Sequence, residues 1–197
     1  MADVTSFDET IAFFADELDS EPSSVAGGKY VAFRLPADVE PDDVLGLMEE
    51  AQKRGATLFI VEPPMEDEEW AVGLAPVADG FAAVEAVGTA GRGGKPSTAE
   101  IVEWLRTTHA TDPLIIDTIT ENAVGGSFVG PVRNPRALAT RLYAFCPEIY
   151  DIVVQELDGD PEVAEELGFP DGVPWHEPIE VLAASLRVDG ALFLFWE

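Results

Sequence analysis

The sequence predicts an α+β protein with a mixed sheet and helices packed mainly on one face. Three observations indicate this class. The chain has 197 residues, of which 47% are hydrophobic and 25% charged, as in ordinary globular proteins. Segments with apolar residues at helical spacing alternate with short runs rich in Val, Ile and Phe, which are typical of strands. Some strand-like runs stand between helices and others follow one another directly, which favours a mixed sheet.

The N-terminal part, residues 1–80, is expected to form a helix followed by a β-α-β unit. Ser6 and Glu9 have the spacing of a capping box, and the residues after them place apolar side chains on one helical face. Residues 21–28 are expected to be a loop. The segments expected next are strand 29–35, helix 41–54, strand 57–61 and a short strand at 70–74.

The C-terminal part, residues 81–197, is expected to be a second α+β domain with ferredoxin-like β-α-β-β-α elements. Ser97 and Glu100 have the spacing of a capping box and mark the start of a helix. Residues 125–127, Gly-Gly-Ser, are interpreted as a hairpin turn. The expected strands are 81–87, 114–120, 127–132 and 191–196, and the expected helices are 97–109, 135–145 and 178–186.

The most informative stretch begins at Asn134 and is predicted to be a capped helix that ends abruptly. Asn134 is a good N-cap, and Pro135 suits the first helical position, where a missing N–H costs nothing. Pro147 cannot continue the helix without losing a backbone hydrogen bond, so the helix should stop just before it. The acids Glu148 and Asp151 are therefore expected at a helix end.

Two short blocks of the chain carry a pattern specific to one family. In the first, a helix runs into an aromatic-Cys-Pro-acid-Ile-x-Asp segment, and in the second an apolar strand closes on aromatic-Trp-acid. The residues concerned are Tyr143, Ala144, Phe145, Cys146, Pro147, Glu148, Ile149 and Asp151, then Leu194, Phe195, Trp196 and Glu197. Together they resemble the bacterial domain-of-unknown-function family 4253, although the family usually has Asp where this chain has Glu148 and Glu197. The resemblance covers at most residues 84–197 and implies no known activity.

The charge of the chain is its strongest anomaly. Its 38 acidic and 11 basic residues give a net charge of −27, and both parts are acidic. Because no basic stripe is available to bind phosphates, we expect no binding of nucleic acid. Two interpretations remain. The acids can hydrate the surface, as in proteins adapted to high salt, or they can attract a basic partner protein.

The compartment follows from the cysteine content and the N-terminus. Cys146 is the only cysteine, so no internal disulfide can form. The N-terminal residues have acids where a signal peptide needs bases, and no apolar run approaches the roughly 18 residues of a membrane span. We therefore expect a cytoplasmic protein that has no membrane association.

No stretch of the sequence specifies a reaction. The glycine-rich residues 88–95 lack the spacing of a phosphate-binding loop, and Pro96 stands where that loop needs a hydroxyl residue. No pair of His or Cys residues has zinc-site spacing, and the acids from Asp158 onward do not keep the register of a calcium loop. Ser127 lacks the glycine that a nucleophile elbow requires. We expect no catalytic residue, no metal and no cofactor.

The remaining candidate site is a group of acids and aromatic residues at the helix end and the strand end. Such a group can form a recognition surface or hold a carboxylate of raised pKa. The simpler alternative is that Trp196 belongs to the core and that Arg141 pairs with an acid. The candidate binding residues are Arg141, Glu148, Asp151, Trp196 and Glu197, with Trp104 and Trp175 as candidate neighbours.

These observations favour a binding or regulatory protein without catalysis. Its most specific form is an immunity-like protein that offers an acidic face to a basic partner. A rival hypothesis is a hydrolytic or transfer enzyme that uses Glu148 and Asp151 as a carboxylate pair. A third is a housekeeping domain adapted to high salt.

Overall fold

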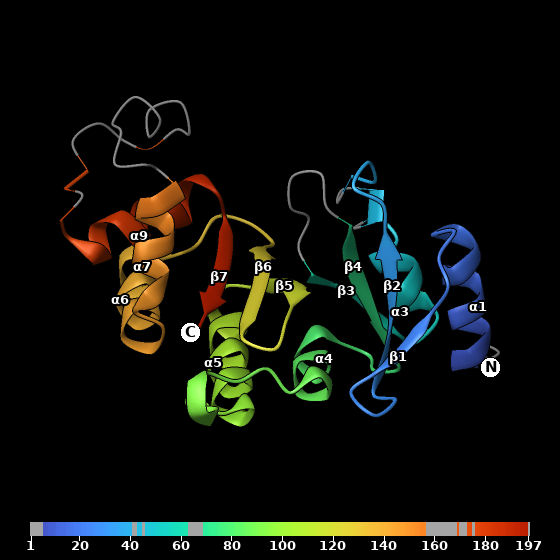
Figure 1. The fold of residues 1–197 in the computed structure, drawn as a ribbon. Coiled ribbons are helices and arrows are strands. Elements are labelled where there is room, and N and C mark those ends of the chain that lie inside the picture. Colours follow the sequence, from blue (N-terminus) through green and yellow to red (C-terminus); the bar gives the residue numbers. More distant parts are fainter. Residues whose placement is uncertain are drawn as a thin grey trace.

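The computed structural model describes residues 6–40, 43–44, 46–62, 69–156, 169, 173–174 and 176–196. Within these residues a mixed sheet of seven strands has the order β1-β2-β4-β3-β5-β6-β7 (Figure 1). The strands are β1 (Ser23–Val25), β2 (Tyr30–Leu35), β3 (Thr57–Glu62), β4 (Trp70–Ala75), β5 (Leu114–Ile119), β6 (Ala123–Phe128) and β7 (Ala191–Phe195). The α+β class with a mixed sheet is confirmed.

Helices flank both halves of this sheet. Helices α1 and α3 lie beside β2 and β4, and the later helices gather around β5, β6 and β7 (Figure 1). The helices described are α1 (Phe7–Glu17), α3 (Met48–Lys53), α4 (Gly80–Val87), the 3-10 helix η1 (Arg92–Gly94), α5 (Thr98–Thr111), α6 (Pro135–Phe145), α7 (Glu148–Glu156) and α9 (Pro178–Val188). No helix in the described part of the chain is both long and apolar enough to cross a membrane.

The N-terminal part contains the expected helix and a split form of the expected β-α-β unit. The capping box is present, because the N–H of Glu9 donates to Ser6 Oγ and the N–H of Ser6 donates to the Glu9 carboxylate. Strand β4 lies between β2 and β3 and is antiparallel to both, so β2 and β3 run parallel without touching. The helix expected at 41–54 is described as a helix from Met48 to Lys53, and residues 41, 42 and 45 lie outside the described part.

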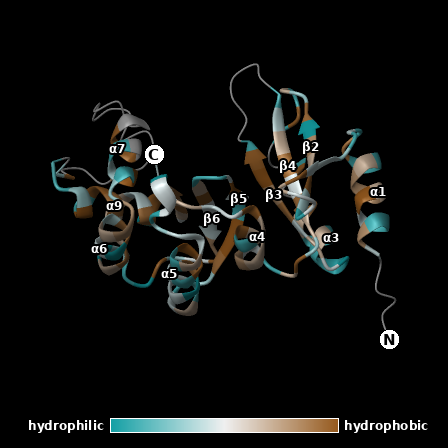
Figure 2. Cartoon of the chain, turned by 60° about the horizontal axis from the view of Figure 1, so that its bottom comes forward, coloured by the Kyte–Doolittle hydropathy of each residue, from teal (hydrophilic) through white to brown (hydrophobic). Residues whose placement is uncertain are grey.

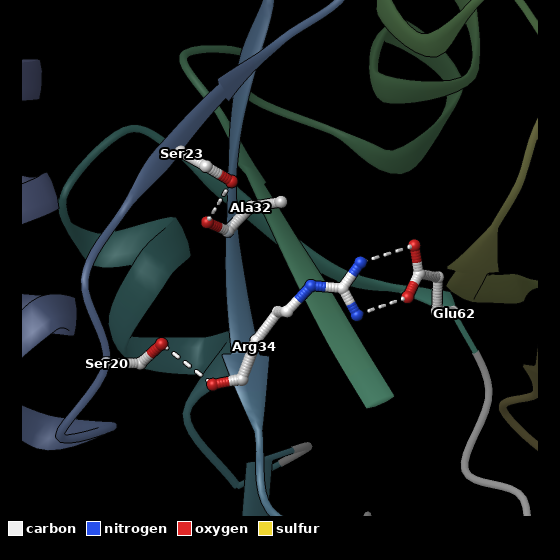
Figure 3. Close-up of polar contacts among 5 residues, drawn as sticks. All are labelled: Ser20, Ser23, Ala32, Arg34 and Glu62. Carbon is white, nitrogen blue, oxygen red and sulfur yellow. Dashed lines mark hydrogen bonds and ion pairs between the residues drawn. The ribbon is translucent and has the colours of Figure 1, made fainter. Parts of the chain in front are cut away.

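The loop expected at 21–28 is wrong, because it contains the edge strand β1. This strand pairs antiparallel with β2, in register at Ser24 and Val31. Two serine side chains, one in β1 and one just before the segment, also bond to β2: Ser23 Oγ donates to the carbonyl of Ala32, and Ser20 Oγ donates to the carbonyl of Arg34 (Figure 3). Two of the three residues of this strand are serines, and three residues are too few to show apolar alternation, so its sequence shows no strand signal.

One face of β2, β4 and β3 is covered by side chains that lie along the sheet. A Cβ at Gly73 would lie 2.7 Å from the Phe59 ring, so the ring occupies the space that a side chain on β4 would need. Arg34 Nη1 donates to Glu62 Oε2 at 3.0 Å, and this ion pair crosses β4 beside the small Ala71 (Figure 3). Because both charged groups are exposed, the pair contributes at most about 1 kcal/mol.

The two halves of the sheet meet where β3 and β5 run parallel, in register at Ile60 and Thr118. In Figure 2, β3 is hydrophobic along most of its length. Leu58 and Ile60 belong to the core under α1 and α3, whereas Phe59 belongs to the core of the C-terminal helices. Since alternate residues of a strand point to opposite faces, these two cores lie on opposite faces of the sheet. The strands before and after residue 80 therefore belong to one continuous sheet. The division of the chain into two domains at residue 80 stays a prediction.

The strand expected at 81–87 is wrong, because this segment forms helix α4. Asp79 caps the helix by accepting the N–H of Ala82 at 2.8 Å, and Gly88 ends it in the left-handed region at φ 83°. Several alanines between these caps favour a helix, and Phe81 and Val84 have helical spacing. The C-terminal part therefore begins with helices, and the ferredoxin-like order does not form there.

The hairpin turn expected at Gly125 to Ser127 is also wrong. These residues lie inside β6, and the turn falls four residues earlier, where Thr120 N–H donates to the carbonyl of Ala123 at 2.9 Å. A side chain at Gly126 would collide with the carbonyl oxygen of Ile115 on β5. Glycine is thus required at this position because the backbone of β5 lies close to it, and not because the chain turns there.

The stretch that begins at Asn134 folds as predicted as far as its end. Asn134 caps α6 by accepting the N–H of Ala137, Pro135 is its first residue, and the helix stops before Cys146. Helix α7, which begins at Glu148 directly after Pro147, was not predicted. A proline that ends one helix also suits the start of another, because its missing N–H is not needed there.

Candidate functional site

Cys146 fastens the end of α6 to the last strand. Its Sγ donates to the carbonyl of Phe195 at 3.0 Å and accepts the N–H of Phe195 at 3.3 Å. On the other side of β7, Trp196 exchanges backbone and side-chain hydrogen bonds with Asn122. Burial raises the pKa of the Cys146 thiol to about 11, so the group stays protonated and is a poor nucleophile. Its role here is to pair with the edge of the sheet.

An aromatic stack extends from this link to α5. Trp104 stacks on Phe145 with ring centroids 5.2 Å apart and planes 11° apart, and Phe145 meets Trp196 edge to face at 5.8 Å. The guanidinium of Arg141 lies 5.5 Å from the Trp104 ring, and its Nη2 donates to Thr108 Oγ1 at 2.9 Å. Trp196 is buried, as the simpler alternative stated, whereas Arg141 binds a hydroxyl and an aromatic ring.

The stack borders an open hollow of about 350 Å³ between α5 and α6. Its wall combines half-buried aromatic rings with acidic side chains. The residues that line it are Glu100, Glu103, Trp104, Thr107, Arg141 and Phe145. Glu100 is engaged by the capping box with Ser97, while Glu103 is exposed. Aromatic faces beside a carboxylate are suited to a cationic side chain.

The predicted acids lie on α7, one turn beyond this hollow along the chain. Glu148 is half-buried, and its Oε2 is buried without a hydrogen-bond partner, whereas Asp151 is exposed. Three residues apart on one helix, they share a face near the helix N-terminus, where negative charge is favoured. Among the described residues no ion pair or hydrogen bond joins them to Arg141. Glu197 and Trp175 lie outside the described residues.

Sequence reasoning missed several residues of the site. Thr108 holds Arg141, and Tyr150 meets Tyr143 of the family block edge to face at 6.4 Å across the helix break, but neither Thr108 nor Tyr150 was expected at the site. The available signal was spacing, because Trp104 and Thr108 on α5 lie four residues apart and therefore on one side of the helix. The spacing of residues within one helix does not show which other helix it packs against. The packing of α5 against α6 therefore could not be predicted from either segment.

A second carboxyl of interest, Asp117, lies on β5 away from this site. The register of β5 and β6 shifts between Ile116 and Thr118, which makes Asp117 the extra residue of a bulge. Burial raises the pKa of the Asp117 carboxyl, and hydrogen bonds from the hydroxyls of Thr118 and Ser127 oppose this in part. Within the described residues no three His, Cys, Asp or Glu side chains are arranged to hold a metal.

The fold and the site together define an α+β domain whose last strand is fastened to a Cys-Pro break between two helices. The chain belongs to the family described as a domain of unknown function, DUF4253, which matches residues 71–197. The resemblance inferred from the two short blocks is therefore confirmed, and the match begins within β4, earlier than residue 84. No curated protein and no solved structure matches the chain.

Proposed function

We propose that the protein is a non-catalytic binding or regulatory protein, of an immunity-like kind, that offers an acidic surface to a basic partner protein. The observation that carries this proposal is the hollow between α5 and α6. It sets the stacked rings of Trp104 and Phe145 beside the exposed carboxylate of Glu103. Trp and Arg are among the residues most enriched in binding hot spots, and an arginine or lysine of a partner can stack on the rings while pairing with the acid.

The charge of the molecule supports the same partner. At −27 the protein attracts basic molecules over distances comparable with the Debye length. In α1 the exposed Asp16 and Glu17 lie in the last turn, which holds no basic residue. Negative charge at a helix C-terminus opposes the helix dipole and lowers stability slightly, which favours a use for these acids other than folding. We place this function in the cytoplasm.

The test is a capture experiment from the source cell at moderate salt, with the full chain as bait. The wild type should retain a basic protein that is released as salt is raised. The variant Glu103→Lys/Asp151→Lys reverses one exposed acid of the hollow and one exposed acid of α7, and it should lose that protein. The matched control Asp38→Lys/Glu49→Lys changes the net charge equally at exposed positions elsewhere and should keep it.

Two results would contradict the proposal. One is that no basic protein is retained by the wild type. The other is that both double variants lose the captured protein to the same extent, since this would show attraction by net charge without a surface of contact. Circular dichroism of both variants establishes that they are folded.

A second candidate function, a hydrolytic or transfer enzyme, is favoured by one observation. Oε2 of Glu148 is buried without a hydrogen-bond partner, and Asp151 lies one turn further on the same helix. A carboxylate pair used as acid and base would titrate with well-separated pKa values. Titration of both side chains by NMR separates the candidates, because two ordinary carboxylate pKa values would remove the enzyme.

A further inference from the structure

Within the described part of the chain, strands β5 and β6 expose one face of the sheet, whereas Ala191 and Phe193 of β7 border a hollow lined by α6, α7 and α9. The register of β5, β6 and β7 places side chains in rows that cross the three strands and alternate between the two faces. Ile116 and Leu192 belong to rows that are buried in the core under α4, α5, α6 and α9. The row of Ile115, Ser127 and Ala191 points to the other face, and all three of these residues are exposed.

This exposed face is apolar at its end. The Ile115 side chain is 49% exposed and Val129 is 65% exposed, and no other large hydrophobic side chain in the described residues is so accessible. Val129 continues β6, because its N–H donates to the carbonyl of Pro113 at 2.8 Å. Two residues beyond Ser127, it lies on the same face as Ile115. Exposed apolar side chains gathered on one face indicate a contact surface.

The same face is almost free of charge. Its next row contains Thr118 and Gly125, and the third member, Phe193 of β7, packs against the core of the C-terminal helices. In the rows that cross the three strands the one charged residue is Asp117, and its carboxylate accepts hydrogen bonds from Thr118 Oγ1 at 2.9 Å and Ser127 Oγ at 3.4 Å. On a molecule with a net charge of −27, such a surface is an exception.

We propose that this face binds the same face of a second copy of the chain and forms a twofold-symmetric dimer. A basic partner would bind to carboxylates, and Asp117 is the one carboxylate in the rows of this face. The face is therefore poorly suited to a basic partner. Two copies of a strongly acidic protein repel each other, so they can meet only where the contact itself carries little charge. In a twofold contact the apolar row of each copy covers that of the other. Because α5 and α6 lie on the opposite side of these strands, the hollow stays accessible in the dimer.

The test measures the mass of the full chain by sedimentation equilibrium between about 0.05 M and 0.5 M NaCl. The wild type should form dimers that tighten as salt rises, because screening reduces the repulsion between the copies. Ile115→Lys and Val129→Lys should each weaken the dimer by about thirtyfold or more, as expected for a buried hot spot. The control Ala110→Lys adds the same charge at an exposed position on α5 and should leave the dimer unchanged.

Asp117→Asn gives an independent check, since removing the charge from this face should tighten the dimer. The proposal is overturned if the wild type is monomeric at every salt concentration, or if neither lysine variant weakens a dimer that does form. It is also overturned if the wild type is monomeric and Ile115→Lys abolishes capture of a cellular protein, because the face would then belong to another partner. Both lysine substitutions are at exposed positions, and circular dichroism verifies their folding.

Discussion

Cys146 and Phe195 lie 49 residues apart in the sequence, and the sulfur of the first both donates to and accepts from the backbone of the second. The thiol thereby occupies hydrogen-bonding positions at the outer edge of β7 that a neighbouring strand would fill in a wider sheet. The Cys-Pro block and the terminal aromatic block, which the sequence shows only as separate motifs, thus form one structural unit. This link also fixes Phe145 between Trp104 and Trp196.

Replacing Cys146 by Ala should lower the free energy of unfolding by about 2 kcal/mol, because the change leaves a small cavity and removes both hydrogen bonds to Phe195. Cys146→Ser keeps a donor and an acceptor at this position and should cost less. Urea denaturation of the three proteins measures the difference. Equal destabilisation by Ala and Ser would show that the hydrogen bonds to β7 contribute nothing.

The thiol also makes stability depend on alkaline pH. Burial raises its pKa from the ordinary value of 9.0 to about 11. A group whose pKa is higher in the folded state stabilises the fold fully below the unfolded value, and the stability is lost as pH rises through the folded value. The free energy of unfolding should therefore fall between pH 9 and about 11 more steeply in the wild type than in Cys146→Ser. Identical pH profiles would contradict this.

Asp117→Asn should raise the melting temperature at neutral pH. Burial raises the pKa of this carboxyl, so its protonated form is favoured in the folded state. Its stabilising contribution is present below the unfolded pKa and is lost as pH rises through the folded pKa. The gain from Asn should consequently disappear in acid, below the ordinary value of 3.8. Thermal unfolding of both proteins at neutral and acidic pH tests this, and a gain of equal size at both would refute it.

Gly126→Ala should destabilise the fold by about 3 kcal/mol, because the new Cβ would collide with the backbone of Ile115 and the strands would have to move apart. Gly130 is the matched control, since a Cβ there meets no atom within 4 Å. Gly130→Ala should change the free energy of unfolding by less than about 1 kcal/mol. Chemical denaturation of both variants gives the comparison, and similar values would show that β5 and β6 can separate at no cost.

The protein should stay folded when dialysed to low ionic strength. A domain adapted to high salt depends on screening of its carboxylates, and removing salt from such a domain leads to loss of structure. A protein whose acidic surface binds a partner stays folded at low salt if its core packing stabilises it more than the repulsion among its carboxylates destabilises it. Far-ultraviolet circular dichroism at about 10 mM and about 0.5 M NaCl measures this. Unfolding at the lower concentration would favour the salt-adapted domain and weaken the proposed function.

Elements with local start and stop signals were predicted well. The capping boxes at Ser6 and Ser97 and the Asn134 cap each specify a helix start within a few residues. Residues 81–87 differ from the prediction because an apolar run of this length fits a strand or a helix, and only the caps at Asp79 and Gly88 decide between the two. The glycines of β6 were misassigned because glycine serves close approach as readily as it serves a turn.

The sequence by itself determined the α+β class, the family, the break after α6 and the acidic character of the surface, because each of these rests on composition or on residues close together in the chain. Only the tertiary structure decided that Cys146 meets Phe195, that Trp104 of α5 stacks on Phe145 of α6, and that β5 and β6 expose one face of the sheet. These relationships depend on which elements pack together. Packing is set by the summed burial of many side chains distant in sequence, and no single segment encodes it.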